Sequence, residues 1–248
     1  MAFQKQVNRY IAPGVKGGWA SANPHASLLQ SNDGDLGESA SPVAVWLVGP
    51  GGLTIGQFAF FDMVTGLVTG GHPGTGAVMT DTAVGTVRIG FIQRDQFALI
   101  TPYMAGATET LFEGQPVTGL VAGDVWAEFA AGAANGQFVF ASIADGSAIA
   151  ANSTAAPTAT ISVTTTNGSP DLTAVGAGLA PGMPVSGAGI PAGAFIVSVD
   201  SAAGTAVMSA NATAAATVNA TATTAILTDY RVNSPCSNGE ISKISVWG

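Results

Sequence analysis

Two apolar runs joined by a glycine-rich turn set the character of this chain: VAVWLV at residues 43–48, GPGG at 49–52 and LTIGQFAFF at 53–61. Short runs rich in Val, Ile and aromatic residues, bounded by Gly and Pro, are typical of β-strands. Glycine and proline supply the backbone conformations that tight turns need. The stretch therefore predicts a strand, a turn and a second strand.

The same pattern continues along the chain. In residues 84–93, Val87, Ile89 and Phe91 alternate with other residues, so one face of the expected strand is apolar. The 33 glycines and 13 prolines also suit many short strands joined by turns. Further strands are predicted at residues 96–101, 116–122, 124–130 and 137–142. We expect an all-β fold with a β-barrel or jelly-roll-like body.

The composition changes near Asp145. Residues 147–228 contain no Lys, Arg, His, Trp or Tyr and consist mostly of Ala, Thr, Gly, Ser and Val. Disorder is one reading, but β-branched runs at 158–165, 195–199, 205–208 and 217–228 favour an inserted small β-sandwich-like module. Charged and aromatic residues return after Thr228, and residues 240–247 alternate like a strand. We therefore assign residues 41–146 and 229–248 to the body and residues 147–228 to the insertion.

Residues 1–40 are predicted to form an extended N-terminal arm. Its apolar residues are spaced among glycines and prolines without a lasting helical or strand period. Such a segment gains little by folding on itself but can bury aromatic side chains against a neighbour. The candidate contacts with a partner protein or a neighbouring copy are Phe3, Val7, Tyr10 and Trp19. The alternative, an arm packed on its own domain, stays open at this point.

The charge distribution restricts the partners of the chain. Seven Lys and Arg oppose fifteen Asp and Glu, which gives a formal charge of −8, and no Lys or Arg lies between Arg94 and Arg231. Nucleic-acid binding needs clustered cations, which displace counterions from phosphates. We therefore expect neither nucleic acid nor an anionic membrane as a partner. Only 9% of residues are charged, which suits a subunit of an assembly.

Residues that could carry chemistry are few. His25 and His72 lie in Gly- and Pro-rich segments without a second ligand at metal spacing, so we expect both to be solvated loop histidines. Asp33, Asp35 and Glu38 could hold Ca²⁺ through carboxylate oxygens, although the EF-hand spacing is not met and a solvated acidic loop is the alternative. We predict no enzyme, no cofactor and no metal site.

An ordered set of short motifs resembles the head cement (decoration) proteins of tailed bacteriophages. The set covers about residues 20–146, and the end of the chain at residues 244–247 is similar too. The motifs are Asn23–Leu28 (NPHASL), Ile55–Phe60 (IGQFAF), Arg88–Thr101 (RIGFIQRDQFALIT), Gly114–Thr118 (GQPVT), Gly123–Trp126 (GDVW) and Gly136–Gly146 (GQFVFASIADG).

The resemblance implies a structural protein on the outer surface of the capsid. Such a protein binds the major capsid protein, bridges its subunits and stabilises the DNA-filled head. Closed symmetry favours a homodimer, with a trimer as the alternative. Without a secretory h-region at the N-terminus, we expect assembly in the cytoplasm of the bacterial host. A glycan-binding or adhesion module of the virion or cell surface is the alternative function.

Overall fold

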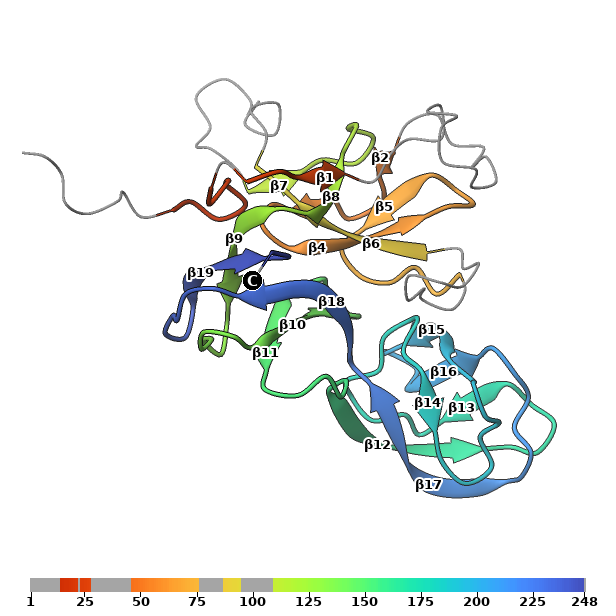
Figure 1. The fold of residues 1–248 in the computed structure, drawn as a ribbon. Coiled ribbons are helices and arrows are strands. Elements are labelled where there is room, and N and C mark those ends of the chain that lie inside the picture. Colours follow the sequence, from red (N-terminus) through yellow and green to blue (C-terminus); the bar gives the residue numbers. More distant parts are fainter. Residues whose placement is uncertain (1–13, 22, 28–45, 76–86, 95–108, 248) are drawn as a thin grey trace, which may run out of the picture.

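The computed structural model describes residues 14–21, 23–27, 46–75, 87–94 and 109–247. These residues form nineteen strands and no helix, so the expected all-β fold is confirmed. The strands belong to three larger sheets and one two-stranded ladder of β3 (Leu53–Thr54) and β7 (Thr110–Leu111). Two of the larger sheets pack together as a body, and the third lies at one end of the molecule (Figure 1).

The first body sheet has six strands in the order β1-β8-β6-β4-β5-β2. Their bounds are β1 Ala26–Ser27, β2 Leu47–Val48, β4 Phe58–Asp62, β5 Leu67–Thr69, β6 Val87–Ile92 and β8 Gly119–Ala122. All pairs are antiparallel except β2 with β5. The sheet curls back on itself, because the Val48 N–H donates to the Gln115 carbonyl (2.9 Å) just before β8. Trp46, Phe61 and Ile92 are buried inside this barrel-like body.

The second body sheet has five antiparallel strands in the order β11-β10-β18-β19-β9. Their bounds are β9 Asp124–Phe129, β10 Phe138–Ser142, β11 Ala148–Ala151, β18 Ala225–Val232 and β19 Glu240–Ser245. The sheet is curled, so that its two edge strands, β9 and β11, approach each other. The C-terminal strand β19 pairs with β9 from Glu240 opposite Phe129 to Ser245 opposite Asp124.

An aromatic cluster joins the two body sheets. The Phe58 ring lies 5.3 Å from Phe91 and 5.8 Å from Tyr230, measured between ring centroids, and all three side chains are buried. Phe58 and Phe91 come from the first sheet and Tyr230 from the second. Burial raises the pKa of the Tyr230 phenol above its usual range. The alternation read in the sequence at residues 84–93 thus places Phe91 in this core.

The third sheet, here called the module sheet, has the order β14-β17-β12-β13-β16-β15. Its strands are β12 Thr158–Thr165, β13 Asp171–Thr173, β14 Val185–Ser186, β15 Ile196–Asp200, β16 Thr205–Met208 and β17 Ala216–Thr223. Hydrogen bonds from the Val185 N–H to the Ala194 carbonyl (2.9 Å) and from the Ile196 N–H to the Met183 carbonyl (2.9 Å) link its two ends. Its walls thus face each other across one core of small and aliphatic side chains.

The predicted insertion at 147–228 can be compared with these sheets. The module sheet is built from residues 158–223, while β11 and β18, which begin and end the predicted insertion, pair with β10 of the second body sheet. The chain therefore leaves the body after β11 and returns at β18. The division into an arm, a body and an insertion stays a prediction. The name module refers to residues 158–223, which contain the module sheet.

Candidate interaction surface

The N-terminal segment of residues 14–21 lies along the edge strand β9. The Gly17 N–H donates to the Trp126 carbonyl (2.8 Å), the Trp126 N–H to the Gly18 carbonyl (3.0 Å), and the Ala20 N–H to the Asp124 carbonyl (2.8 Å). This antiparallel pairing satisfies backbone groups that an edge strand would otherwise expose. Residues 14–21 of the predicted arm therefore pack on their own body, as the second of the two alternatives proposed.

Ion pairs fix one end of this segment. The ammonium group of Lys16, whose side chain is only 12% exposed, lies 2.9 Å from Glu128 and 3.7 Å from Glu109. Arg94 donates its Nε–H to the Lys16 carbonyl (3.0 Å) and pairs with Glu109 at 3.2 Å. Networks of this kind constrain geometry more than isolated surface pairs do. The segment is thus held by side chains from β9 and from the residues after β6.

Asp124 fixes the other end. Its carboxylate is 1% exposed and accepts hydrogen bonds from Ser21 Oγ (2.6 Å) and Asn23 Nδ2 (2.8 Å). The Lys243 ammonium of β19 lies 2.8 Å from the same oxygen, Oδ2. Burial opposes ionisation, but the hydrogen bonds from Lys243 and Ser21 outweigh it and lower the pKa of Asp124 to about 2. One buried carboxylate therefore joins the N-terminal segment to the C-terminal strand.

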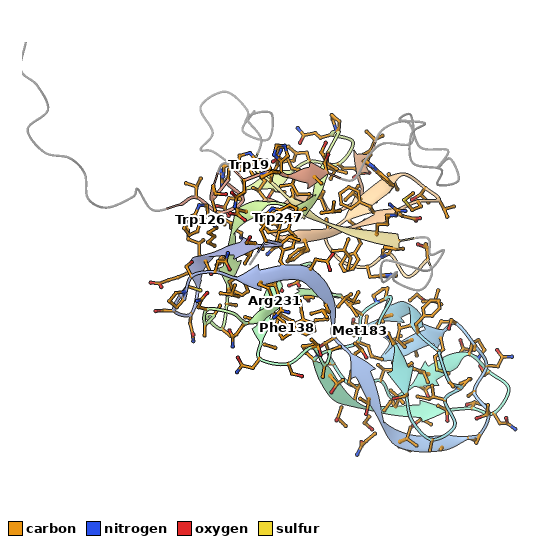
Figure 2. All side chains as sticks on the ribbon, viewed as in Figure 1. Trp19, Trp126, Phe138, Met183, Arg231 and Trp247 are labelled. Atoms are coloured by element: carbon orange, nitrogen blue, oxygen red, sulfur yellow. The ribbon has the colours of Figure 1, made fainter. Side chains whose placement is uncertain are left out.

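A surface of aromatic side chains lies beside this anchor, and we call Trp19, His25 and Trp247 the tryptophan patch. The Trp19 and His25 rings lie 4.5 Å apart between centroids, and Trp247 donates its Nε1–H to the Pro24 carbonyl (3.2 Å). Both indoles therefore flank the dipeptide of residues 24–25. Trp19 is 42% exposed and Trp247 58% exposed. Figure 2 labels both on the body, away from the module.

The candidate contact residues and calcium ligands divide between described and undescribed parts of the chain. Trp19 lies on its own β9, in a bridge with Val125, and keeps part of its indole exposed. Its contact with a neighbour stays a prediction. The other predicted residues, Phe3, Val7, Tyr10, Asp33, Asp35 and Glu38, lie outside the described residues.

The prediction for His72 was wrong. His72 is 3% exposed and lies where the first body sheet meets the module. Its ring packs against Phe60 (5.4 Å between centroids), and its Nδ1 accepts the Gly74 N–H (3.0 Å). A Cβ built on Gly182 of the module would lie 2.1 Å from this ring. Burial lowers the pKa of His72 to about 4, although the Asp62 carboxylate opposes this shift.

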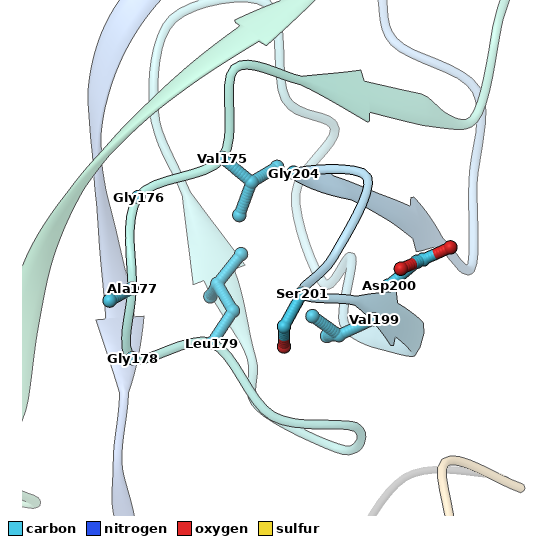
Figure 3. A pocket seen from close by; sticks show the side chains of 9 residues that line it. All are labelled: Val175, Gly176, Ala177, Gly178, Leu179, Val199, Asp200, Ser201 and Gly204. Atoms are coloured by element: carbon cyan, nitrogen blue, oxygen red, sulfur yellow. The ribbon is translucent and has the colours of Figure 1, made fainter.

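The module carries a small hollow of about 200 Å³ between residues 175–179 and 199–204. Figure 3 shows the side chains of Val175, Leu179, Val199 and Ser201 around it. Aromatic rings, on which sugars commonly stack, are missing from this lining. The hollow therefore offers no platform of the kind that the glycan-binding alternative needs.

Groups suited to metal or membrane binding were sought within the described ranges. There, no three His, Cys, Asp or Glu residues lie close enough together to hold a metal ion. The same ranges contain no helix long and apolar enough to span a membrane.

The protein is thus all-β, with an N-terminal segment anchored on its body and aromatic side chains exposed beside this anchor. The family model of the XM1 gp53 minor capsid protein matches residues 3–176, which is more than half of the chain. The chain belongs to this minor capsid protein family, and its role is a structural one in the phage capsid. Neither the curated proteins nor the solved structures contain a significant match.

Proposed function

We propose that this protein is a cement protein that decorates the outer surface of the phage head. It bridges subunits of the major capsid protein and so stabilises the DNA-filled shell, without enzymatic activity. An interface across a seam between capsomers has to break before the shell opens, and contacts repeated over a closed shell act together. The family match supports a capsid role, and the charges described next support the outer surface.

The observation that carries the proposed location is the engagement of the cations. Each Lys and Arg in the described ranges interacts with a group of the same chain: Lys16, Arg94 and Lys243 with carboxylates, Arg231 with the Phe138 ring (3.5 Å), and Arg88 with another group. Asp171, Asp200 and Asp229, in contrast, are exposed. Such a surface is poorly suited to binding DNA phosphates and suits the side of the shell that faces away from the genome.

The module is proposed to project outward from the shell. It contains no cation, and the chain leaves the body after β11 and returns at β18, the two strands that flank β10 in the second body sheet. Insertions of this kind are tolerated where they do not interrupt the contacts of the host domain. The module can therefore point away from the capsid while the body stays bound.

Binding to purified heads tests the proposal. Expanded heads that lack the protein are incubated with the full chain, and bound protein is measured by co-sedimentation. The decorated heads are then heated, and DNA release is followed with an intercalating dye. We expect saturable binding and a higher temperature of DNA release than for undecorated heads. Bound protein that does not change the release temperature would contradict the cementing role.

Accessibility to an impermeant reagent tests the location. Labelling through a thiol avoids the lysine side chains of the described ranges, which are engaged in ion pairs. A cysteine is therefore introduced in the module by Ser201→Cys and labelled with a maleimide too large to cross the shell. We expect labelling of intact particles at the rate seen for the free protein. Labelling only after the particles are opened would place the protein inside the shell. The native Cys236, which is half-buried, is replaced in both samples.

The glycan-binding alternative is tested on the same material. A glycan array probed with the full chain is expected to show no binding that depends on the module, because Phe195 is the single aromatic residue between 147 and 228. Selective binding that is lost on changing residues of the module hollow would favour adhesion over cementing.

A further inference from the structure

The tryptophan patch exposes two indoles on the surface of the body. Two indoles are 42% and 58% exposed, although indoles contribute strongly when buried in an interface. Neither ring serves the anchor, because the backbone of residues 17–20 and the Asp124 carboxylate hold the segment without them. The patch thus has the properties of a binding site for an apolar or cationic segment.

The described chain begins beside Trp126 of β9. Residues 17–20 run antiparallel to β9, so that Gly17 and Gly18 lie opposite Trp126, and Ala20 opposite Asp124. A turn closed by the hydrogen bond from the Gly18 N–H to the Val15 carbonyl (2.8 Å) brings Gly14 against the Trp126 ring, where an added Cβ would come within 2.3 Å. Residues 1–13 are joined to the described part of the chain at this point, beside Trp126. Fully extended, they reach at most about 45 Å.

The composition of residues 1–13 complements the rest of the molecule. Lys5 and Arg9 are two of the seven cations in the chain, and no Asp or Glu occurs before Asp33. The remaining residues carry five cations against fifteen acidic residues. A cationic segment that also contains Phe3, Val7 and Tyr10 would bring apolar contacts and cation–π interactions to exposed indoles. It would also reduce the repulsion between two acidic bodies.

We propose that the tryptophan patch is the docking site for residues 1–13 of a second copy of this chain. Each copy then offers one arm, residues 1–13, and one acceptor, the tryptophan patch. Two copies can exchange arms reciprocally, and larger rings can form by the same contact. This goes beyond the proposed function, because the contact joins two copies and needs no shell.

A complementation experiment tests the inference. One variant lacks residues 1–13 and keeps the patch. The other, Trp19→Ala with Trp247→Ala, keeps the arm and loses both indoles. We expect the full chain to self-associate at micromolar concentration in sedimentation velocity and each variant alone to stay monomeric. An equimolar mixture should form a one-to-one heterodimer. Val64→Ala is the matched control, because Val64 is 63% exposed in the turn between β4 and β5 and is not part of the tryptophan patch. It should associate like the full chain.

Three outcomes would overturn the inference: a monomeric full chain, undiminished association without residues 1–13, or a mixture that remains two monomers. Thermal unfolding of each variant is measured to check that it folds. A second readout uses the full chain with a photo-crosslinking phenylalanine analogue at Tyr10, mixed with an isotope-labelled copy. Crosslinks to residues 19–27 or 240–247 of the labelled copy are expected. Crosslinks only within one copy, or only to other regions, would contradict docking between copies. Because no heads are present, these results are independent of the cementing test.

Discussion

Replacing Lys243 by Met removes the cation from the anchor between the N-terminal segment and β19. The Asp124 carboxylate would keep its hydrogen bonds from Ser21 and Asn23 but would lose the ammonium at 2.8 Å. Asp124 is 1% exposed, so water cannot replace the lost partner without opening the site. The Met side chain has nearly the same length and stays apolar, so the packing of the aliphatic part of Lys243 is largely kept.

The expected loss follows from the burial of the carboxylate. Removing one partner of a buried ion pair costs about 3–5 kcal/mol. The Lys243 side chain is itself 26% exposed, which favours the lower end, about 3 kcal/mol. For a protein of this size, 1 kcal/mol shifts the melting temperature by about 2–4 °C, so we expect Lys243→Met to melt roughly 6–12 °C lower at pH 7.

The pH dependence gives the sign of the effect. The pKa of Asp124 is lowered to about 2 in the native state from 3.8, so its stabilisation is present above pH 4 and is lost as the pH falls towards 2. The difference in melting temperature between the native chain and Lys243→Met should therefore shrink over that range. The double variant Asp124→Asn with Lys243→Met should recover most of the loss, because no buried charge remains. A Lys243→Met melting curve within 1 °C of the native one at pH 7 would refute the reasoning.

Three further predictions concern the core and the junction with the module. His72 has a native pKa of about 4 against 6.5, so the unfolded chain binds more protons between these values. Thermal melts should show stability falling from pH 6.5 to 4, and His72→Phe should flatten this slope; an unchanged slope would contradict the assignment. Gly182→Ala should loosen the junction and speed proteolysis between body and module, because the added Cβ would meet His72. Gly193→Ala is the control: it has a similar φ of +77° and no atom within 4 Å of the added Cβ, so it should carry the backbone strain alone. Phe58→Ala should cost about 3–5 kcal/mol in denaturant unfolding, and a loss below 1 kcal/mol would show that the two body sheets do not depend on this ring.

Local patterns predicted several strands well, but not all of them. The run at 53–61 is divided into β3 and β4, and the run at 217–228 covers parts of β17 and β18. β12 and β16 have the bounds that the β-branched runs at 158–165 and 205–208 indicate. The alternation around Phe91 predicted the burial of Val87 and Phe91, but Ile92 on the opposite face of β6 is buried as well. Such features depend on neighbours in the sequence, so the sequence displays them directly. β13 and β14, in contrast, have three and two residues and stand among glycines and prolines, so no periodic signal could reveal them.

The features that position the surface depend on contacts between distant residues. Ser21, Asp124 and Lys243 meet only because β19 pairs with β9 while residues 14–21 cover the free edge of β9. His72 is buried because glycines on both sides of the junction, Gly74 and Gly182, let two backbones approach. A glycine-rich loop around a single histidine resembles a solvated loop in the sequence. The close packing of Gly182 against it becomes visible only in three dimensions.

The central claim is that this minor capsid protein cements the head from outside. A cryo-EM reconstruction of the intact, DNA-filled particle tests it most directly. We expect density for the two body sheets on the outer face of the shell, in contact with at least two major capsid protein subunits, and the module farther from the shell. Density on the inner face, or contact with only a single capsid subunit, would contradict it.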